Sequence, residues 1–355
     1  MKYRGFLDHD IFLDQEKRIY FVLGHFQPTE RIISLLKYIP NPEGTWIRKK
    51  AKKRYVRTYQ HQGIKAFQNS IKMAKDEGSE LLDKWWIIDP VFNTGFLEVP
   101  RDAVNEHLIP EERISDIMTK APESLDFLEK KVKFIVSSMV AELKSLEGNY
   151  SDIGITGSVL WNGYSERSDI NLNIYGRDLC LRMKDELDEK ARKKENLHEK
   201  LHVKLKGFGK FYNITLEDGM EPSFIDRKIK LKLENFAPGI QIRWCLKEGE
   251  FPLNYGDESF KDVGFTKRKL KIIDDTYSIF FPAMLKVECL DDGPFVERLL
   301  IYDTRFVKLF KKGDAVAITG LLQEINGGKK YQILIGSKQF SNSENVEFLK
   351  SSSEL

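Results

Sequence analysis

The stretch from Ile153 to Gly176 constrains the fold of this chain more than any other. A short apolar run ends in Gly157-Ser158, and after a connector (159–168) a second run begins at Asp169. In the second run, side chains of two kinds alternate: Ile170, Leu172 and Ile174 on one face, and Asp169, Asn171 and Asn173 on the other. Alternation with a period of two is typical of a half-buried strand. The sequence therefore predicts a Gly-Ser corner followed by a strand that presents acidic and amide side chains in a row.

The residue types in this stretch suit a phosphate and a metal ion. A Gly-Ser turn that leads into a helix offers backbone N–H groups and a hydroxyl to a phosphate. Asp169 and Asn171 are two residues apart on a strand, so their side chains point the same way. Oxygen ligands of this kind hold Mg²⁺, which bridges protein carboxylates and substrate phosphates in phosphoryl transfer. Gly157 and Ser158 are thus candidate nucleotide-binding residues, and Asp169 and Asn171 are candidate metal ligands.

This pattern resembles the signature of the polymerase-beta-like nucleotidyltransferase superfamily, a hydrophobic-Gly-Ser followed by Asp-hydrophobic-Asp on the next strand. Gly157, Ser158 and Asp169 match it, and Asn171 stands where the second Asp is expected. An amide offers one neutral oxygen in place of a carboxylate, which predicts weaker metal binding. The superfamily also uses a third carboxylate on a later strand. Asp226 is the candidate for it, with Glu217 as a second choice.

The resemblance extends along the chain to a chiefly archaeal family of predicted nucleotidyltransferases. The segments that carry it, besides Gly157-Ser158 and Ser168-Asp169, are Arg4 to Asp10, Val22 to His25, Leu36 to Pro40, Asp89 to Phe92, Val99 to Asp102 and Phe280 to Ala283. It implies transfer of a nucleotidyl group from an NTP to a hydroxyl acceptor, dependent on Mg²⁺ or Mn²⁺. In this interpretation Asp169 and Asp226 are catalytic, and Asp169, Asn171 and Asp226 bind the metal. The alternative is a non-catalytic RNA- or nucleotide-binding protein that retains the fold.

Composition limits the class of protein. The chain has 355 residues, of which 31% are charged, and a net charge of only +3, so charge alone does not indicate a nucleic-acid partner. Three cysteines, Cys180, Cys245 and Cys289, lie far apart and show no zinc-finger or disulfide spacing, which favours a reducing cytoplasm. No apolar run approaches the roughly 20 residues of a membrane span. We expect a cytoplasmic protein without a membrane partner.

A basic run in the first third of the chain is a weaker candidate site for nucleic acid. Lys49, Lys50, Lys53 and Arg54 lie in it, with Trp46, Tyr55 and Tyr59 interleaved. Basic and aromatic side chains together suit phosphate contacts and base stacking. A solvated loop is an equally good interpretation. The histidines His9, His25 and His61 are more simply structural than metal ligands.

The hydrophobic pattern predicts an α+β protein in three parts. Short strand-like runs fill a β-rich N-terminal domain, 1–122. A helix from Ser124 to Glu147, with Ser124 as its N-cap, opens a nucleotidyltransferase-like palm, 123–235. Regular short strands with turn signals, among them Asn326-Gly327, then predict a C-terminal OB-like β-barrel, 236–340, followed by a tail, 341–355. Barrels of this kind often bind oligonucleotides.

Overall fold

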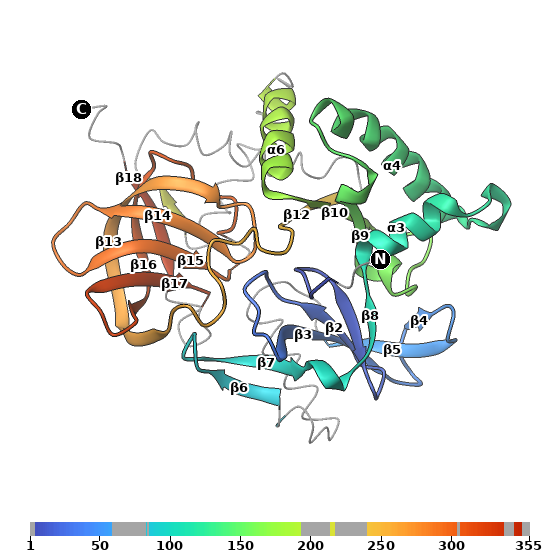
Figure 1. The fold of residues 1–355 in the computed structure, drawn as a ribbon, viewed down its shortest axis with the longest axis horizontal. Helices are drawn as coiled ribbons and strands as arrows, with labels where there is room; N and C mark the ends of the chain where they lie inside the picture. Colours follow the sequence, from blue (N-terminus) through green and yellow to red (C-terminus); the bar gives the residue numbers. More distant parts are fainter. Residues whose placement is uncertain are drawn as a thin grey trace. The chain divides into compact units, whose positions relative to one another are not determined.

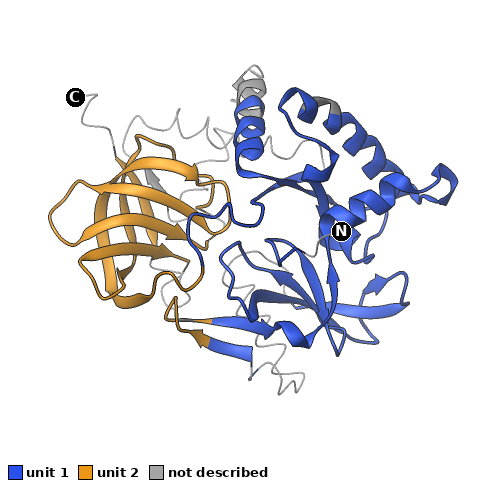
Figure 2. Ribbon diagram, viewed as in Figure 1, with its two compact units in different colours: residues 1–87, 96–186, 234–254 blue, residues 88–95, 187–233, 255–355 orange. Residues whose placement is uncertain are grey.

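The structure is a computed structural model that describes residues 4–58, 83, 85–192, 214–216, 240–303, 306–336 and 344–349. The chain forms two compact units (Figure 2). The first unit comprises residues 1–87, 96–186 and 234–254, and the second comprises 88–95, 187–233 and 255–355. Helices and strands are mixed, with strands in the majority (Figure 1), which confirms the α+β class. None of the described helices is long and apolar enough to cross a membrane.

An eight-stranded sheet forms the N-terminal part of the chain. Its strands are β1 (Ile11–Asp14), β2 (Ile19–Val22), β3 (Arg31–Pro40), β4 (Trp46–Arg48), β5 (Lys53–Arg57), β6 (Trp86–Asp89), β7 (Thr94–Pro100) and β8 (Val104–Leu108). The order is β4-β5-β3-β2-β1-β8, and β7 pairs with β3 and with β6. The tip of the β6–β7 hairpin, residues 88–95, belongs to the second unit.

This sheet has apolar side chains on both faces. One face carries a cluster that includes Phe12, Tyr20, Ile32 and Val99. The other carries Ile11, Leu13, Ile19, Tyr38 and Tyr55, together with Leu160 and Trp161 from later in the chain. Trp161 is fully buried, with the rings of Tyr38 and Tyr55 at centroid distances of 4.8 Å and 5.5 Å. The Gly-Ser connector is therefore packed onto the N-terminal sheet.

Two helices follow the N-terminal sheet. Helix α3 (Pro110–Thr119) was not expected from the sequence, and α4 (Phe127–Ser145) is the helix that was expected to begin at Ser124. The N-cap of α4 is Asp126, whose side chain accepts a hydrogen bond from the Glu129 amide while Glu129 caps the Asp126 amide in return. Ser124 lies in a short 3₁₀ turn before it. This reciprocal capping box satisfies two amides, which explains why the helix begins two residues later than a single serine cap predicts.

A small three-stranded sheet contains the stretch that dominates the sequence. Its elements are β9 (Ile153–Thr156), α5 (Gly157–Leu160), β10 (Ile170–Tyr175), α6 (Arg177–Arg192) and β12 (Ile240–Cys245). The central strand β10 is antiparallel to β9 and parallel to β12. Residues 240–245, which were expected in the C-terminal β domain, therefore pair with the Gly-Ser and Asp-Asn segments.

The second unit is built around a seven-stranded sheet. Its strands are β11 (Ile214–Leu216), β13 (Phe260–Tyr277), β14 (Ala283–Cys289), β15 (Phe295–Ile301), β16 (Ala315–Ile325), β17 (Lys330–Ile335) and β18 (Asn345–Leu349). The order is β11-β18-β16-β13-β14-β15-β17, and β17 also pairs with β16. Asn326 and Gly327 both have positive φ angles, as the tight turn between β16 and β17 requires. The expected strand at 278–281 is a turn.

The buried indole of Trp161 gives a direct test of the packing in the first unit. We expect Trp161→Ala to lower the free energy of unfolding by about 3–5 kcal/mol, because it removes a fully buried aromatic side chain. Phe134→Ala on α4 is the control, since Phe134 is 74% exposed, and its effect should stay within about 0.5 kcal/mol. Urea unfolding followed by circular dichroism measures both. Equal effects of the two substitutions would contradict the packing described here.

Candidate functional site

One face of the three-stranded sheet gathers the polar side chains of the Asp-Asn strand. The register places Asn171 between Thr156 on β9 and Gln241 on β12, and Asn173 between Gly154 and Arg243. Because neighbouring strands in register present paired residues on the same face, these side chains form one surface. Asn173 donates a hydrogen bond from Nδ2 to the Tyr175 hydroxyl at 2.9 Å, which confirms that the alternate residues of β10 lie on one side.

This polar face is covered at one end and accessible at the other. Asn173 is fully buried, Asn171 is partly exposed and Asp169 is exposed. At the covered end an added Cβ on Gly154 would lie 2.6 Å from Cβ of Pro110, so the absence of a side chain there lets α3 pack against β9. Thr156 donates a hydrogen bond to the His9 carbonyl at 2.7 Å. Among the described residues of this face, the Asp169 end is therefore the exposed one.

The Gly157 turn lies directly against this accessible end. Gly157 has a φ of +67°, a conformation that favours glycine, and an added Cβ would lie 2.9 Å from Nδ2 of Asn171. Ser158 follows in the first turn of α5, and its carbonyl accepts a hydrogen bond from the Gly163 amide at 2.9 Å. The structure thus places the Gly157 backbone against the Asn171 side chain.

Asp169 keeps its carboxylate accessible. It immediately precedes β10, on the strand that carries Asn171. It forms no hydrogen bond or ion pair with another residue of the described ranges. An ion pair with a buried lysine or arginine would have prevented Asp169 from binding a ligand. Asp169 forms no such pair within the described residues. Asp226 and Glu217, the expected third carboxylates, lie outside the described residues.

The strand next to β10 presents an amide and a cation. On β12, Gln241 is paired with Asn171, and the Arg243 guanidinium donates to the Gln241 side-chain oxygen at 3.0 Å. Sequence reasoning missed both residues, because it assigned this strand to another domain. Among the described residues of the polar face, Asp169 supplies a carboxylate, whereas Asn171 and Gln241 are amides.

Further positive charge lies near Arg243. Burial, and then repulsion by Arg57 and Arg243, lower the pKa of Lys37 well below its ordinary value. The Lys37 ammonium lies 3.6 Å from the centroid of the Phe21 ring. Phe21 belongs to the face of the N-terminal sheet that packs on Trp161. Burial and the neighbouring Arg57 and Arg243 therefore disfavour the charged form of Lys37, and the lasting positive charge here is that of the two guanidinium groups.

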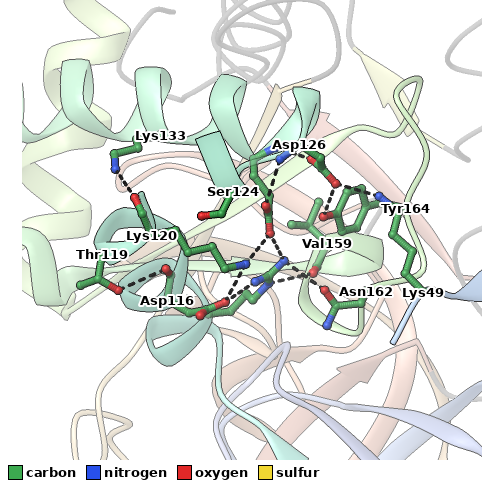
Figure 3. Close-up of polar contacts among 12 residues, drawn as sticks. Lys49, Asp116, Thr119, Lys120, Ser124, Asp126, Lys133, Val159, Asn162 and Tyr164 are labelled. Atoms are coloured by element: carbon green, nitrogen blue, oxygen red, sulfur yellow. Dashed lines mark hydrogen bonds and ion pairs between the residues drawn. The ribbon is translucent and has the colours of Figure 1, made fainter. Parts of the chain in front are cut away.

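A polar network holds the connector after the Gly157 turn (Figure 3). The Arg113 guanidinium on α3 donates to the Val159 carbonyl at 3.4 Å and to the Asn162 side chain at 3.0 Å. It also pairs with Glu129 on α4 at 2.7 Å. In Figure 3, Tyr164 and Lys49 both point toward Asp126, each at 2.8 Å. These contacts tie residues 159–164 to α3, α4 and the β4–β5 hairpin.

The basic run forms this β4–β5 hairpin rather than an irregular loop. Its aromatic side chains Trp46 and Tyr55 face Tyr38 and Trp161, so they pack in the interior rather than offering rings to bases. Lys49 pairs with Asp126 and lies 3.6 Å from the centroid of Tyr164. Arg54 donates to the Gly44 carbonyl at 3.2 Å. A nucleic-acid role for this hairpin remains a prediction.

Comparison with known proteins gives a relative but no function. An uncharacterized protein of the archaeon Methanocaldococcus jannaschii is 22% identical over 357 residues, which cover 95% of this chain and 97% of that protein. No protein-family model matches the chain. No solved structure matches it significantly. The chain is thus similar over nearly its whole length to a protein whose name states no activity.

The contact between Gly157 and Asn171 can be measured as a coupling energy. We expect Gly157→Ala to destabilise the protein by about 1–3 kcal/mol, because alanine is strained at a positive φ and its Cβ collides with the amide. Gly249→Ala is the control, since Gly249 has a φ of +79° but no atom within 4 Å of an added Cβ. In the Gly157→Ala background, Asn171→Ala should restore part of the lost free energy of unfolding, namely the part by which the loss in Gly157→Ala exceeds the loss in Gly249→Ala. A double-mutant cycle measured by urea unfolding would report this coupling. No recovery would contradict the contact.

The Asp126 junction predicts a specific pH dependence of stability. Burial opposes its ionisation, but hydrogen bonds from Lys49, the Glu129 amide and Tyr164 outweigh burial and lower its pKa from 3.8 to about 2. A carboxyl group with a lowered pKa in the folded state stabilises the protein above its unfolded pKa and loses that contribution as the pH falls through the folded pKa. Asp126→Asn should therefore flatten the fall in stability between about pH 4 and pH 2, and Tyr164→Phe should flatten it partly. The free energy of unfolding across this range tests both, and an unchanged slope in Asp126→Asn would contradict the role of the junction.

Proposed function

We propose that this protein binds a nucleotide through its phosphates at the polar face of the three-stranded sheet, and that it does so without a catalytic metal pair. It would then be a non-catalytic relative of the nucleotidyltransferases that its sequence resembles. The observation that carries this proposal is that the two side chains paired at Asn171 are both amides. The superfamily signature has a second carboxylate two residues after the first, whereas this chain has Asn171 there, with Gln241 beside it on β12.

Charge favours phosphate over a divalent cation at this face. Two-metal transfer requires several carboxylates to neutralise the ions. Here Asn171 and Gln241 are amides, and the Arg243 guanidinium, which donates to the Gln241 side chain, contributes positive charge. A guanidinium group repels a further cation and attracts an anion. Arginine in particular binds phosphate oxygens through paired N–H donors.

The geometry of the Gly157 turn supports the same ligand. A glycine with positive φ lets a ligand approach the backbone closely, and Ser158 adds a hydroxyl group. The turn contacts Asn171 at the accessible end of the face. Phosphates held between the turn and the Arg243 guanidinium would leave the nucleoside on the Asp169 side.

Transfer of a nucleotidyl group with Mg²⁺ or Mn²⁺ is the competing proposal. It depends on Asp226 as a third carboxylate and on metal binding by Asp169 with only the Asn171 amide beside it. The finer domain assignments are proposals of the same kind: a nucleotidyltransferase palm in the first unit and an OB-like barrel in the second. The pairing of β17 with both β15 and β16 supports the barrel. RNA binding by Lys49, Lys50, Lys53 and Arg54 is a further proposal, and Lys50 is exposed.

One pair of assays separates the two functions. Binding of ATP is measured by calorimetry in EDTA, and incorporation of labelled NTPs is measured with Mg²⁺ or Mn²⁺ and bulk RNA. We expect ATP binding in EDTA that survives Asp169→Ala and weakens by about tenfold or more in Arg243→Gln, because a charge-assisted hydrogen bond is lost. Lys130→Gln, an exposed lysine of α4, is the matched control and should change nothing.

The results of these two assays distinguish nucleotide binding from nucleotidyl transfer. Incorporation that requires the metal and disappears in Asp169→Ala and in Asp226→Ala would replace the binding proposal with the transferase. Metal-dependent incorporation that arises only in Asn171→Asp would support descent from an active enzyme. Absence of ATP binding under every condition would contradict both proposals.

A further inference from the structure

A second group of functional side chains lies in the first unit, apart from Asp169. Asp8, His25 and Cys245 each offer a ligand atom, and these atoms lie within 4.8 Å of one another. Asp8 precedes β1, His25 follows β2, and Cys245 ends β12. Residues this far apart in the sequence show no ligand spacing, which is why sequence reasoning treated the histidine as structural and the cysteine as isolated.

Asp8 and Cys245 are buried, His25 is partly exposed, and the carboxylate is held in place. Asp8 is 1% exposed and Cys245 is fully buried. One oxygen of Asp8 accepts a hydrogen bond from the Gly24 amide at 2.7 Å, and the other contacts Nδ1 of His9 at 2.7 Å. Carboxylate oxygens have further lone pairs, so these contacts orient Asp8 without using up its capacity as a ligand.

The His25 ring has one satisfied nitrogen and one that is not. Nε2 accepts a hydrogen bond from the Leu246 amide at 3.1 Å. Nδ1 is buried and has no hydrogen-bond partner in the described chain. A buried polar atom without a partner is costly and rare, and a bound ion is one of its standard explanations. Burial lowers the pKa of His25 to about 4, so the ring is neutral at pH 7 and able to act as a ligand.

We propose that Asp8, Nδ1 of His25 and Cys245 bind one zinc ion. Sulfur, nitrogen and oxygen donors together suit Zn²⁺, whereas Mg²⁺ takes oxygen ligands, so this centre is distinct from any metal site at Asp169. Binding releases the Cys245 thiol proton to solvent. It also moves the ring proton of His25 from Nδ1 to Nε2, which can then no longer accept the hydrogen bond from the Leu246 amide.

Cobalt substitution tests the centre on the full chain. The metal content of the purified protein is measured first, and we expect about one zinc ion per chain. The metal is then removed with a chelator and replaced by Co²⁺, which gives a charge-transfer absorption band only with a thiolate ligand. The chain has three cysteines, so the double variant Cys180→Ala/Cys289→Ala leaves Cys245 alone and should retain the band. Cys245→Ser should lose it, and Asp8→Asn should weaken Co²⁺ binding by at least about tenfold.

Each result decides for or against the site. A wild-type protein that binds neither zinc nor cobalt, a band that persists in Cys245→Ser, or a band lost in the double variant would overturn it. If Cys245→Ser does not fold, the double variant decides, because Cys245 is then the sole source of a thiolate. A shift of the Leu246 amide resonance on metal binding, in protein labelled with ¹⁵N-leucine, would confirm ligation through Nδ1, and an unchanged resonance would contradict it. None of these readouts depends on ATP binding, so the zinc site and the proposed function can fail separately.

Discussion

The backbone pairing of β10 with β9 on one side and β12 on the other determines which residues share a site. This register sets Asn171 beside both Thr156 and Gln241, and it brings the Gly157 turn against the same amide. A slip of one residue would turn Asp169 and Asn171 toward the opposite face. The apolar side chains Ile170, Leu172 and Ile174 are all fully buried, which opposes such a slip.

The covering of the polar face follows from the same pairing. Gly154 lies opposite Asn173 and admits Pro110 of α3, while the segment before β1 contacts Thr156 and Cys245. These contacts bury the far end of the face and leave the Asp169 end accessible. In the proposed function, the Asn171 and Gln241 amides and the Arg243 guanidinium would bind an anion rather than a divalent cation, so no metal is required.

Local patterns in the sequence predicted the elements better than their partners. The alternation from Asp169 to Ile174 correctly indicated β10, and Asn326-Gly327 indicated the turn between β16 and β17. The strand at 240–245 was also expected, but its pairing with β10 depends on a long-range contact that no local pattern encodes. Gln241 and Arg243 were therefore missed as site residues. The group of Asp8, His25 and Cys245 was missed for the same reason, since its members meet only in the folded chain. The sequence did not predict helix α3, because its ten residues carry only a short apolar pattern.

The dependence of ATP affinity on free Mg²⁺ tests the central claim most directly. If the polar face binds phosphate through its own cationic and amide groups, the affinity for ATP at increasing concentrations of free Mg²⁺ should equal the affinity measured in EDTA or fall below it. The reason is that the ion neutralises the phosphates that the protein recognises. An affinity that rises by about tenfold or more with Mg²⁺, and that loses this rise in Asp169→Ala, would contradict the account and identify a metal-dependent nucleotide site.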